Sequence, residues 1–348
     1  MGRGGGGGCT PRPPIHQQPP ERRVVTVVFL GLLLDLLAFT LLLPLLPGLL
    51  ESHDRAHDPL YGSWQGGVNW FATAIGMPVE KRYNSVLFGG LIGSAFSVLQ
   101  FLCAPLTGAT SDCLGRRPVM LLCLAPSVSL GLHDAADLLS PLALLRFSAV
   151  ARGQDPPTGD RLSSLRRLGL VYFLYLFLFS GLEYTLSFLT HQRFQFSSLQ
   201  QGKMFFLIGL TMATIQGAYA RRIHPGGEVA AVKRALLLLV PAFLLIGWSH
   251  SLPMLGLGLL LYSFAAAVVV PCLSSVVAGY GSPGQKGTVM GTLRSLGALA
   301  RAAGPLVAAS VYWLAGAQAC FTTWSGLFLL PFLLLQKLNY SAQTLKAE

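Results

Sequence analysis

The sequence predicts an all-α membrane protein with about eight spanning helices, two in a first group and six in a second. Hydrophobic residues make up 52% of the chain and charged residues only 11%, whereas soluble globular proteins have about 25% charged residues. Several apolar runs also approach the roughly 20 residues that span a bilayer. Helices are the expected spanning elements because the hydrocarbon core offers the backbone no water to bond.

The apolar runs fall into two groups separated by a polar segment. Two runs come first, Val24–Leu50 and Val86–Leu106. A weaker run, Val119–Leu132, contains Pro126 and is too short to span. The second group consists of Leu170–Thr190, Met204–Ala220, Ala235–Trp248, Leu252–Leu273, Thr288–Ala317 and Gln318–Leu335.

These runs predict five regions along the chain. Residues 1–22 are rich in Gly and Pro and predict a disordered tail. An N-terminal helix bundle over 23–132 is followed by a polar linker over 133–168. A complete six-helix bundle over 169–336 precedes a short tail, 337–348.

The net charge of +11 follows from where the basic residues lie. Arginines and lysines gather in alternate loops and tails, whereas the intervening loops are nearly neutral or carry balanced charge, as in Glu51–Asp58. This is the distribution that orients membrane helices with the basic side in the cytosol. It predicts a multi-pass protein of the plasma membrane or an organelle membrane, with cytosolic termini and linker. The loop Glu51–Ser85 is predicted to lie outside. The basic excess therefore needs no nucleic-acid partner.

Signatures of enzymes and metal sites are missing from the sequence. The six cysteines are scattered without a CxxC pair. His53 and His57 are spaced like metal ligands but have no third ligand nearby. No P-loop occurs, which argues against ATP-driven transport. We therefore predict no cofactor, no metal and no enzymatic activity.

The loop after the second apolar run carries the most specific motif. The loop has the pattern Gly-x-x-x-Asp-x-x-Gly-Arg-Arg, formed by Gly108, Asp112, Gly115, Arg116 and Arg117. Cys113 directly follows Asp112. The glycines permit close helix contact and a tight reversal, and the arginines hold the loop in the cytosol. The stretch resembles the corresponding loop of the major facilitator superfamily, in its drug:proton antiporter branch.

Three further stretches agree with this resemblance. Residues 35–47 are similar to the family's first helix and 285–305 to its eleventh, and Gly217–Arg222 is a degenerate second copy of the loop motif. The resemblance implies a proton-coupled secondary transporter of small organic anions or drugs, in which two helix bundles rock about a midplane site. Its partners would be the solute, protons and the lipid bilayer.

The first half is shorter than this family requires. Only about fifty residues separate Arg117 from Arg167, which is too few for the four helices expected there. We interpret this as an in-frame internal loss, as in a splice form. An alternative function is therefore a non-transporting shortened form, which is degraded or pairs with a full-length copy and regulates it.

Two acidic residues lie at membrane depth, Asp35 in the first apolar run and Glu183 in the third. Each is a candidate for proton coupling, and Asp35 also for contact with a cation, because a carboxyl group at that depth costs about 2.5–3.5 kcal/mol and needs a physical reason. The structural alternative is a hydrogen-bonded packing role. For Asp35 the two interpretations are balanced, and for Glu183 coupling is favoured.

Arg294 and Arg301 are candidates for substrate binding. They lie seven residues apart and therefore share one face of a predicted helix. Arg301 lies mid-helix and keeps its charge, so it must pair with an acid such as Asp35 or Glu183, or bind an anion. Arg294 could instead reach the cytosolic interface, as long basic side chains do near helix ends.

Overall fold

The computed structural model describes residues 66, 67, 70, 73, 97–104, 144–151, 159–224, 226–280 and 285–336. The chain divides into two compact units, Met1–Gly93 and Ser94–Glu348. Nearly all described residues belong to the second unit, and the fold below is the fold of that unit. The predicted span Val24–Leu50 lies outside the described residues.

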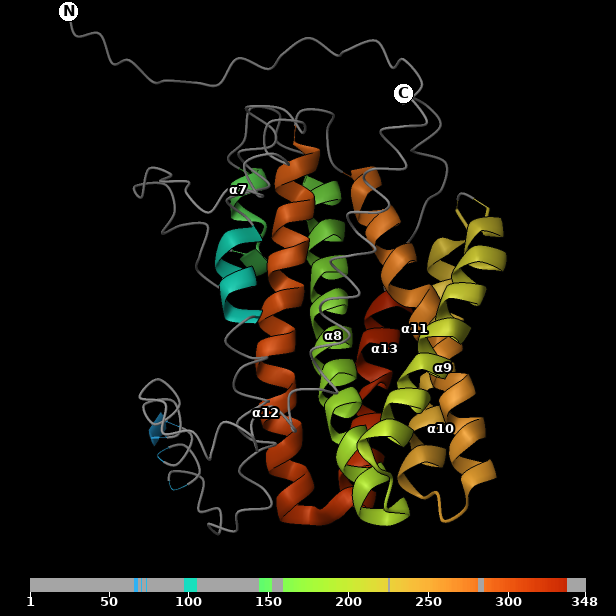
Figure 1. Cartoon of the computed structure of the whole chain (residues 1–348). Helices are drawn as coiled ribbons and strands as arrows, with labels where there is room; N and C mark the ends of the chain where they lie inside the picture. The colour runs from blue at the N-terminus through green and yellow to red at the C-terminus, as the bar shows by residue number, and fades with distance from the viewer. Residues whose placement is uncertain are drawn as a thin grey trace, which may run out of the picture. The chain divides into compact units, whose positions relative to one another are not determined.

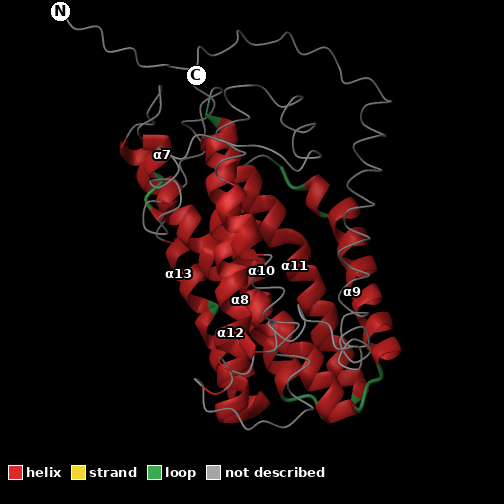
Figure 2. Ribbon diagram, turned by 60° about the vertical axis from the view of Figure 1, so that its left-hand side comes forward, coloured by secondary structure: helices red, strands yellow, loops and turns green. Residues whose placement is uncertain are grey.

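The described part of the second unit contains helices and loops only (Figure 1, Figure 2). A helical segment over 97–104 comes first. The elements that follow are α7 Ser148–Ala151, α8 Gly159–Phe194, α9 Ser198–Ala218, the 3-10 turn η1 Ala220–Arg222, α10 Glu228–Gly247, α11 Leu252–Tyr280, α12 Lys286–Leu327 and α13 Leu329–Gln336. Among these residues, four stretches are long and apolar enough to cross a membrane: α8, α10, α11 and Leu314–Gln336.

α12 extends across the boundary between the last two predicted runs. α12 covers Thr288–Ala317 and enters the following run, but Gly316 interrupts it with φ 82 and ψ 169. Residues other than glycine rarely adopt that backbone conformation. Gly316 therefore bends the chain between two helices, near the boundary that hydropathy predicted.

α8 begins earlier than the apolar run that predicted it. Its first turns lie in the segment expected to be linker, and they form an amphipathic helix. Leu165 and Leu168 are buried there, whereas Asp160 and Arg161 are exposed. Burial of one apolar face stabilises these turns, and α8 therefore starts at Gly159 rather than near Leu170.

α9 starts with a reciprocal cap. The Ser197 hydroxyl accepts a hydrogen bond from the Gln200 backbone N–H at 3.4 Å, and the Gln200 side-chain oxygen accepts one from Ser197 N at 2.8 Å. This pair satisfies backbone donors that the first turn of a helix leaves free. The cap fixes the short connection between α8 and α9.

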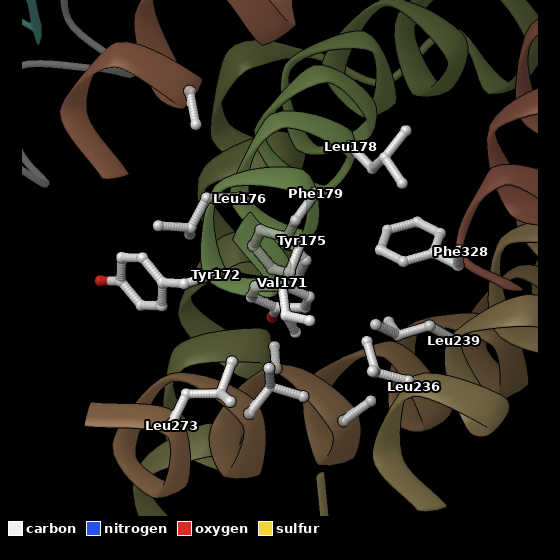
Figure 3. Packing of buried hydrophobic residues seen from close by; sticks show 14 of the residues in the cluster. Val171, Tyr172, Tyr175, Leu176, Leu178, Phe179, Leu236, Leu239, Leu273 and Phe328 are labelled. Atoms are coloured by element: carbon white, nitrogen blue, oxygen red, sulfur yellow. The ribbon is translucent and has the colours of Figure 1, made fainter. Parts of the chain in front are cut away.

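The core of the unit is built around α8. Tyr175, Phe179 and Phe328 lie together on one side of α8, and Tyr172 points to another side (Figure 3). The ring of Phe179 stacks on Tyr262 of α11 at 5.1 Å between centroids. α8 thus joins the α10–α11 pair to α12 and α13.

α8 and α12 approach closely through two glycines. A Cβ added to Gly304 would lie 2.4 Å from the Phe177 carbonyl oxygen, and one added to Gly181 would lie 2.8 Å from the Ala308 Cβ. Small residues at helix contacts are characteristic of membrane bundles. This contact fixes the register of α8 against α12, and hence the relative positions of Glu183 and Arg301.

Candidate functional site

The carboxyl group of Glu183 is attached to the core by a hydrogen bond. Glu183 lies on α8 two residues after Gly181, and its side chain is exposed in the described unit. Its carboxylate accepts a hydrogen bond from the hydroxyl of Tyr262 on α11. Tyr262 itself is 1% exposed. The Glu183 carboxylate thus lies next to the buried hydroxyl of Tyr262.

Arg301 lies on α12, one turn before Gly304, and is exposed. Its Nη2 donates a hydrogen bond of 2.9 Å to the side-chain oxygen of Gln100, which belongs to the helical segment 97–104. The sequence predicts an acid or an anion as the partner of Arg301. The described structure supplies a neutral amide, which orients the guanidinium without neutralising its charge.

Glu183 and Arg301 lie close enough to interact electrostatically. They do not form an ion pair or a hydrogen bond with each other in the described structure. A carboxylate and a guanidinium attract each other even without direct contact. The charge state of Glu183 therefore changes how strongly Arg301 attracts a third, negatively charged group.

Arg294 is two helical turns before Arg301 and is also exposed. Both arginines interact electrostatically with the hydroxyl of Tyr172 on α8. The Tyr172 ring covers Gly297, where an added Cβ would lie 2.9 Å from the ring. Tyr172 thus lies along the same stretch of α12 as the two arginines, on the side of α8 away from Phe328 (Figure 3).

Several predicted site residues lie outside the described residues. These are Asp35 and the loop-motif residues Gly108, Asp112, Gly115, Arg116 and Arg117. Their roles remain predictions. Among the residues that the structure describes, no group of three or more His, Cys, Asp or Glu side chains could hold a metal ion.

Sequence reasoning missed three residues of this arrangement, namely Gln100, Tyr172 and Tyr262. Each lies in or beside an apolar run, where a polar group needs a partner. That signal marks them as polar but does not tell which helix supplies the partner. In the structure, Gln100 lies next to Arg301, Tyr172 lies along α12, and Tyr262 lies next to Glu183.

Taken together, the arrangement offers three kinds of chemical group on one part of the bundle. Glu183 can take up or release a proton, the arginines can bind a negatively charged group, and the tyrosine hydroxyls can donate hydrogen bonds. None of these roles requires a covalent bond to form or break, apart from the transfer of a proton. Such a set suits reversible binding of a small anion together with a proton.

Comparison with known proteins agrees with the family resemblance. The sequence profile described as Major Facilitator Superfamily matches residues 138–305. The human Major facilitator superfamily domain-containing protein 10 is 73% identical over 455 positions, with 100% of both chains covered. Its bovine counterpart is 62% identical over 456 positions, again with 100% of both chains covered. The class C tetracycline resistance protein of Escherichia coli is 33% identical over 96 residues, 27% of this chain and 18% of that protein.

A solved structure is also similar. The crystal structure of the human organic anion transporter MFSD10 (TETRAN) superimposes with a TM-score of 0.85 at 72% identity. The match covers 92% of this chain and 100% of that chain. The alignment with the human sequence spans 455 positions and this chain has 348 residues, so 107 positions (455 less 348) have no residue here. The relatives thus contain residues that this chain lacks.

Proposed function

The chain belongs to the major facilitator superfamily and is a membrane transport protein rather than an enzyme, and from this premise we propose that its six-helix half carries a proton-coupled site for small organic anions. The expected all-α bundle with an incomplete first half is confirmed. The substrate class and the coupling to protons are the proposed part. The name of the similar human structure, which is that of an organic anion transporter, is consistent with the substrate class.

The observation that carries the proposal is the neutral partner of Arg301. Gln100 occupies one N–H group of the guanidinium at 2.9 Å, and the remaining N–H groups can bind a carboxylate or sulfonate in a bidentate manner. Arg294, on the same face of α12, adds a second positive charge. A cationic drug would gain nothing from these two arginines, so we assign the site to anions.

Glu183 supplies the coupling. When its carboxyl group is ionised, it attracts Arg301 and repels an incoming anion; when it is protonated, both effects vanish. Protonation and anion binding therefore favour each other. Because such coupling is reciprocal, a bound anion also favours proton uptake by Glu183.

The experiment that tests this proposal is a binding titration of the purified protein. Affinity for a small aromatic carboxylate is measured at several pH values in the natural protein and in Arg301→Gln and Glu183→Gln variants. The proposal requires weaker binding in the first variant and binding without pH dependence in the second. Equal affinity of all three proteins at every pH would refute it.

A second candidate function follows from the missing positions. The 107 alignment positions without residues here fit an incomplete first half, and rocking transport needs two bundles around the site. We propose that this chain alone binds its anion but does not drive net transport. Its role would then be regulatory, by pairing with a full-length copy, or the chain would be degraded.

A further inference from the structure

A hollow of about 260 Å³ lies between the end of α9 and the start of α10, away from Glu183 and Arg301 in the sequence. Arg222, His224 and Arg234 line it, together with the ring of Tyr219. The described residues that line it include no acid. We propose that this hollow binds a phosphate group, and that the head group of an anionic phospholipid is its favoured source.

Backbone hydrogen bonds shape the two turns that border the hollow. Arg222 N donates to Tyr219 O at 3.0 Å, and Gly227 N donates to His224 O at 2.9 Å. Gly226 has φ +99, which glycine tolerates and most residues do not. On the other side, the Tyr219 ring packs against Phe264 of α11 at 5.4 Å.

One face of α10 supplies the opposite wall. Gly227, Ala230, Ala231 and Arg234 all line the hollow, and their spacing of three and four residues places them on one side of the helix. Small side chains at the first three positions leave space in front of Arg234. The arrangement therefore combines room for a phosphate group with two guanidinium groups at its edges.

The two arginines that line the hollow have no partner among the described side chains. The side chains of Arg222 and Arg234 are exposed, and neither guanidinium group makes a hydrogen bond or ion pair with any residue that the structure describes. The nearest acid in sequence, Glu228, accepts a hydrogen bond of 2.8 Å from Ser275 of α11 and does not line the hollow. Arginine binds phosphate oxygens through paired N–H groups, which makes phosphate the matching anion.

The position of the hollow along the chain favours a lipid. The apolar runs on either side end at Ala220 and resume at Ala235, so the hollow lies at the surface of the bilayer. α9 presents exposed Phe206, Leu207 and Leu210 earlier in the same helix, where acyl chains would lie. Basic pockets at the cytosolic ends of membrane helices are suited to anionic head groups.

The test is native mass spectrometry of the purified chain in a neutral detergent. Dioctanoyl phosphatidic acid, dioctanoyl phosphatidylcholine and glycerol phosphate are titrated in parallel. Phosphatidic acid should bind saturably, and the double variant R222Q/R234Q should bind it about thirtyfold more weakly, because each arginine contributes about 1 kcal/mol near an anionic surface. Phosphatidylcholine, whose head group has no net charge, should bind weakly to both proteins.

Two further variants test the site in a way that does not depend on correct folding of R222Q/R234Q. Ala230→Trp fills the hollow without changing charge and should also weaken phosphatidic acid binding. Lys286→Gln removes an exposed positive charge that does not line the hollow, and should bind as the natural protein does. Phosphatidic acid binding unchanged in both R222Q/R234Q and Ala230→Trp would overturn the proposal.

The titration with glycerol phosphate, which is water-soluble, identifies the source of the phosphate group. If phosphatidic acid binds more tightly than glycerol phosphate, and both depend on Arg222 and Arg234, the site is a lipid site. Equal affinities with the same dependence would support the phosphate site and assign it to a soluble anion. None of these measurements involves transport, so their outcome is independent of the function proposed above.

Discussion

Arg301 of α12 donates a 2.9 Å hydrogen bond to the amide oxygen of Gln100, which lies about two hundred residues earlier in the chain. Ser295, on the same helix, donates a 2.7 Å hydrogen bond to the carbonyl oxygen of Phe101. The segment 97–104, from the short first half, is thereby attached to α12 at two points. An arginine in the bundle is thus oriented by a neutral group and keeps its full charge for a ligand.

The first prediction concerns this arginine. Arg301→Gln should weaken binding of a small aromatic carboxylate by about tenfold or more, because a charge-assisted hydrogen bond contributes about 1.5–3 kcal/mol. Arg294→Gln is the matched comparison, since it removes the same charge two turns away. A fluorescence or calorimetric titration gives both affinities. If Arg294→Gln has no effect while Arg301→Gln does, Arg294 has the interfacial role that the sequence left open.

The second prediction concerns Glu183. At a pH where Glu183 is ionised, anion binding should be weaker than at a lower pH, because the carboxylate repels the anion and attracts Arg301. Glu183→Gln mimics the protonated form, so it should bind as the natural protein does at low pH, at every pH tested. Any proton-coupled flux should likewise lose its pH dependence while expression is unchanged. Unaltered pH dependence in this variant would return Glu183 to a packing role.

The third prediction concerns the contact between α8 and α12. Gly304→Val should lower stability by about 1–3 kcal/mol, the usual cost of overpacking, because a Cβ there meets the Phe177 carbonyl and the Ser180 hydroxyl. Thermal unfolding in detergent measures the change as a lower Tm. Gly209→Val, on α9, is the control, since an added Cβ there has nothing within 4 Å. Equal Tm values for both variants would argue against the close contact.

The fourth prediction concerns orientation. In a parent protein without reactive cysteines, Asp160→Cys should resist an impermeant maleimide added from outside the cell, because the basic residues place 133–168 in the cytosol. Ser63→Cys, in the loop predicted to lie outside, should react. Labelling of the Asp160 position in intact cells would reverse the predicted orientation of the whole chain.

The helices of the second unit were largely predictable, because the length of an apolar run is visible in the sequence alone. Glu183 and Arg301 were predictable for the same reason, as charged residues inside such runs. The start of α8 at Gly159 was not, since it depends on burial of Leu165 and Leu168 against neighbours. The hydrogen bonds of Tyr262 and Gln100 were not predictable either, because they depend on which helices are adjacent.

The last prediction concerns transport by this chain alone. The candidate site residues Glu183 and Arg301 are both exposed in the described unit. In a complete transporter a second bundle would form the other wall of a midplane site. Gln100, in the short first half, accepts a hydrogen bond from Arg301. That bond holds one segment in place but does not replace the missing helices.

We therefore expect binding without accumulation. Purified protein in liposomes with an imposed pH gradient should take up no more labelled organic anion than protein-free liposomes do. The human relative of full length, reconstituted in parallel, shows whether the assay detects flux. Addition of this chain to the relative tests the pairing hypothesis: a dose-dependent loss of the relative's flux would support regulation. Saturable, gradient-driven uptake by this chain alone would contradict this prediction, because it would show that transport does not require a second complete bundle to form the other wall of the site.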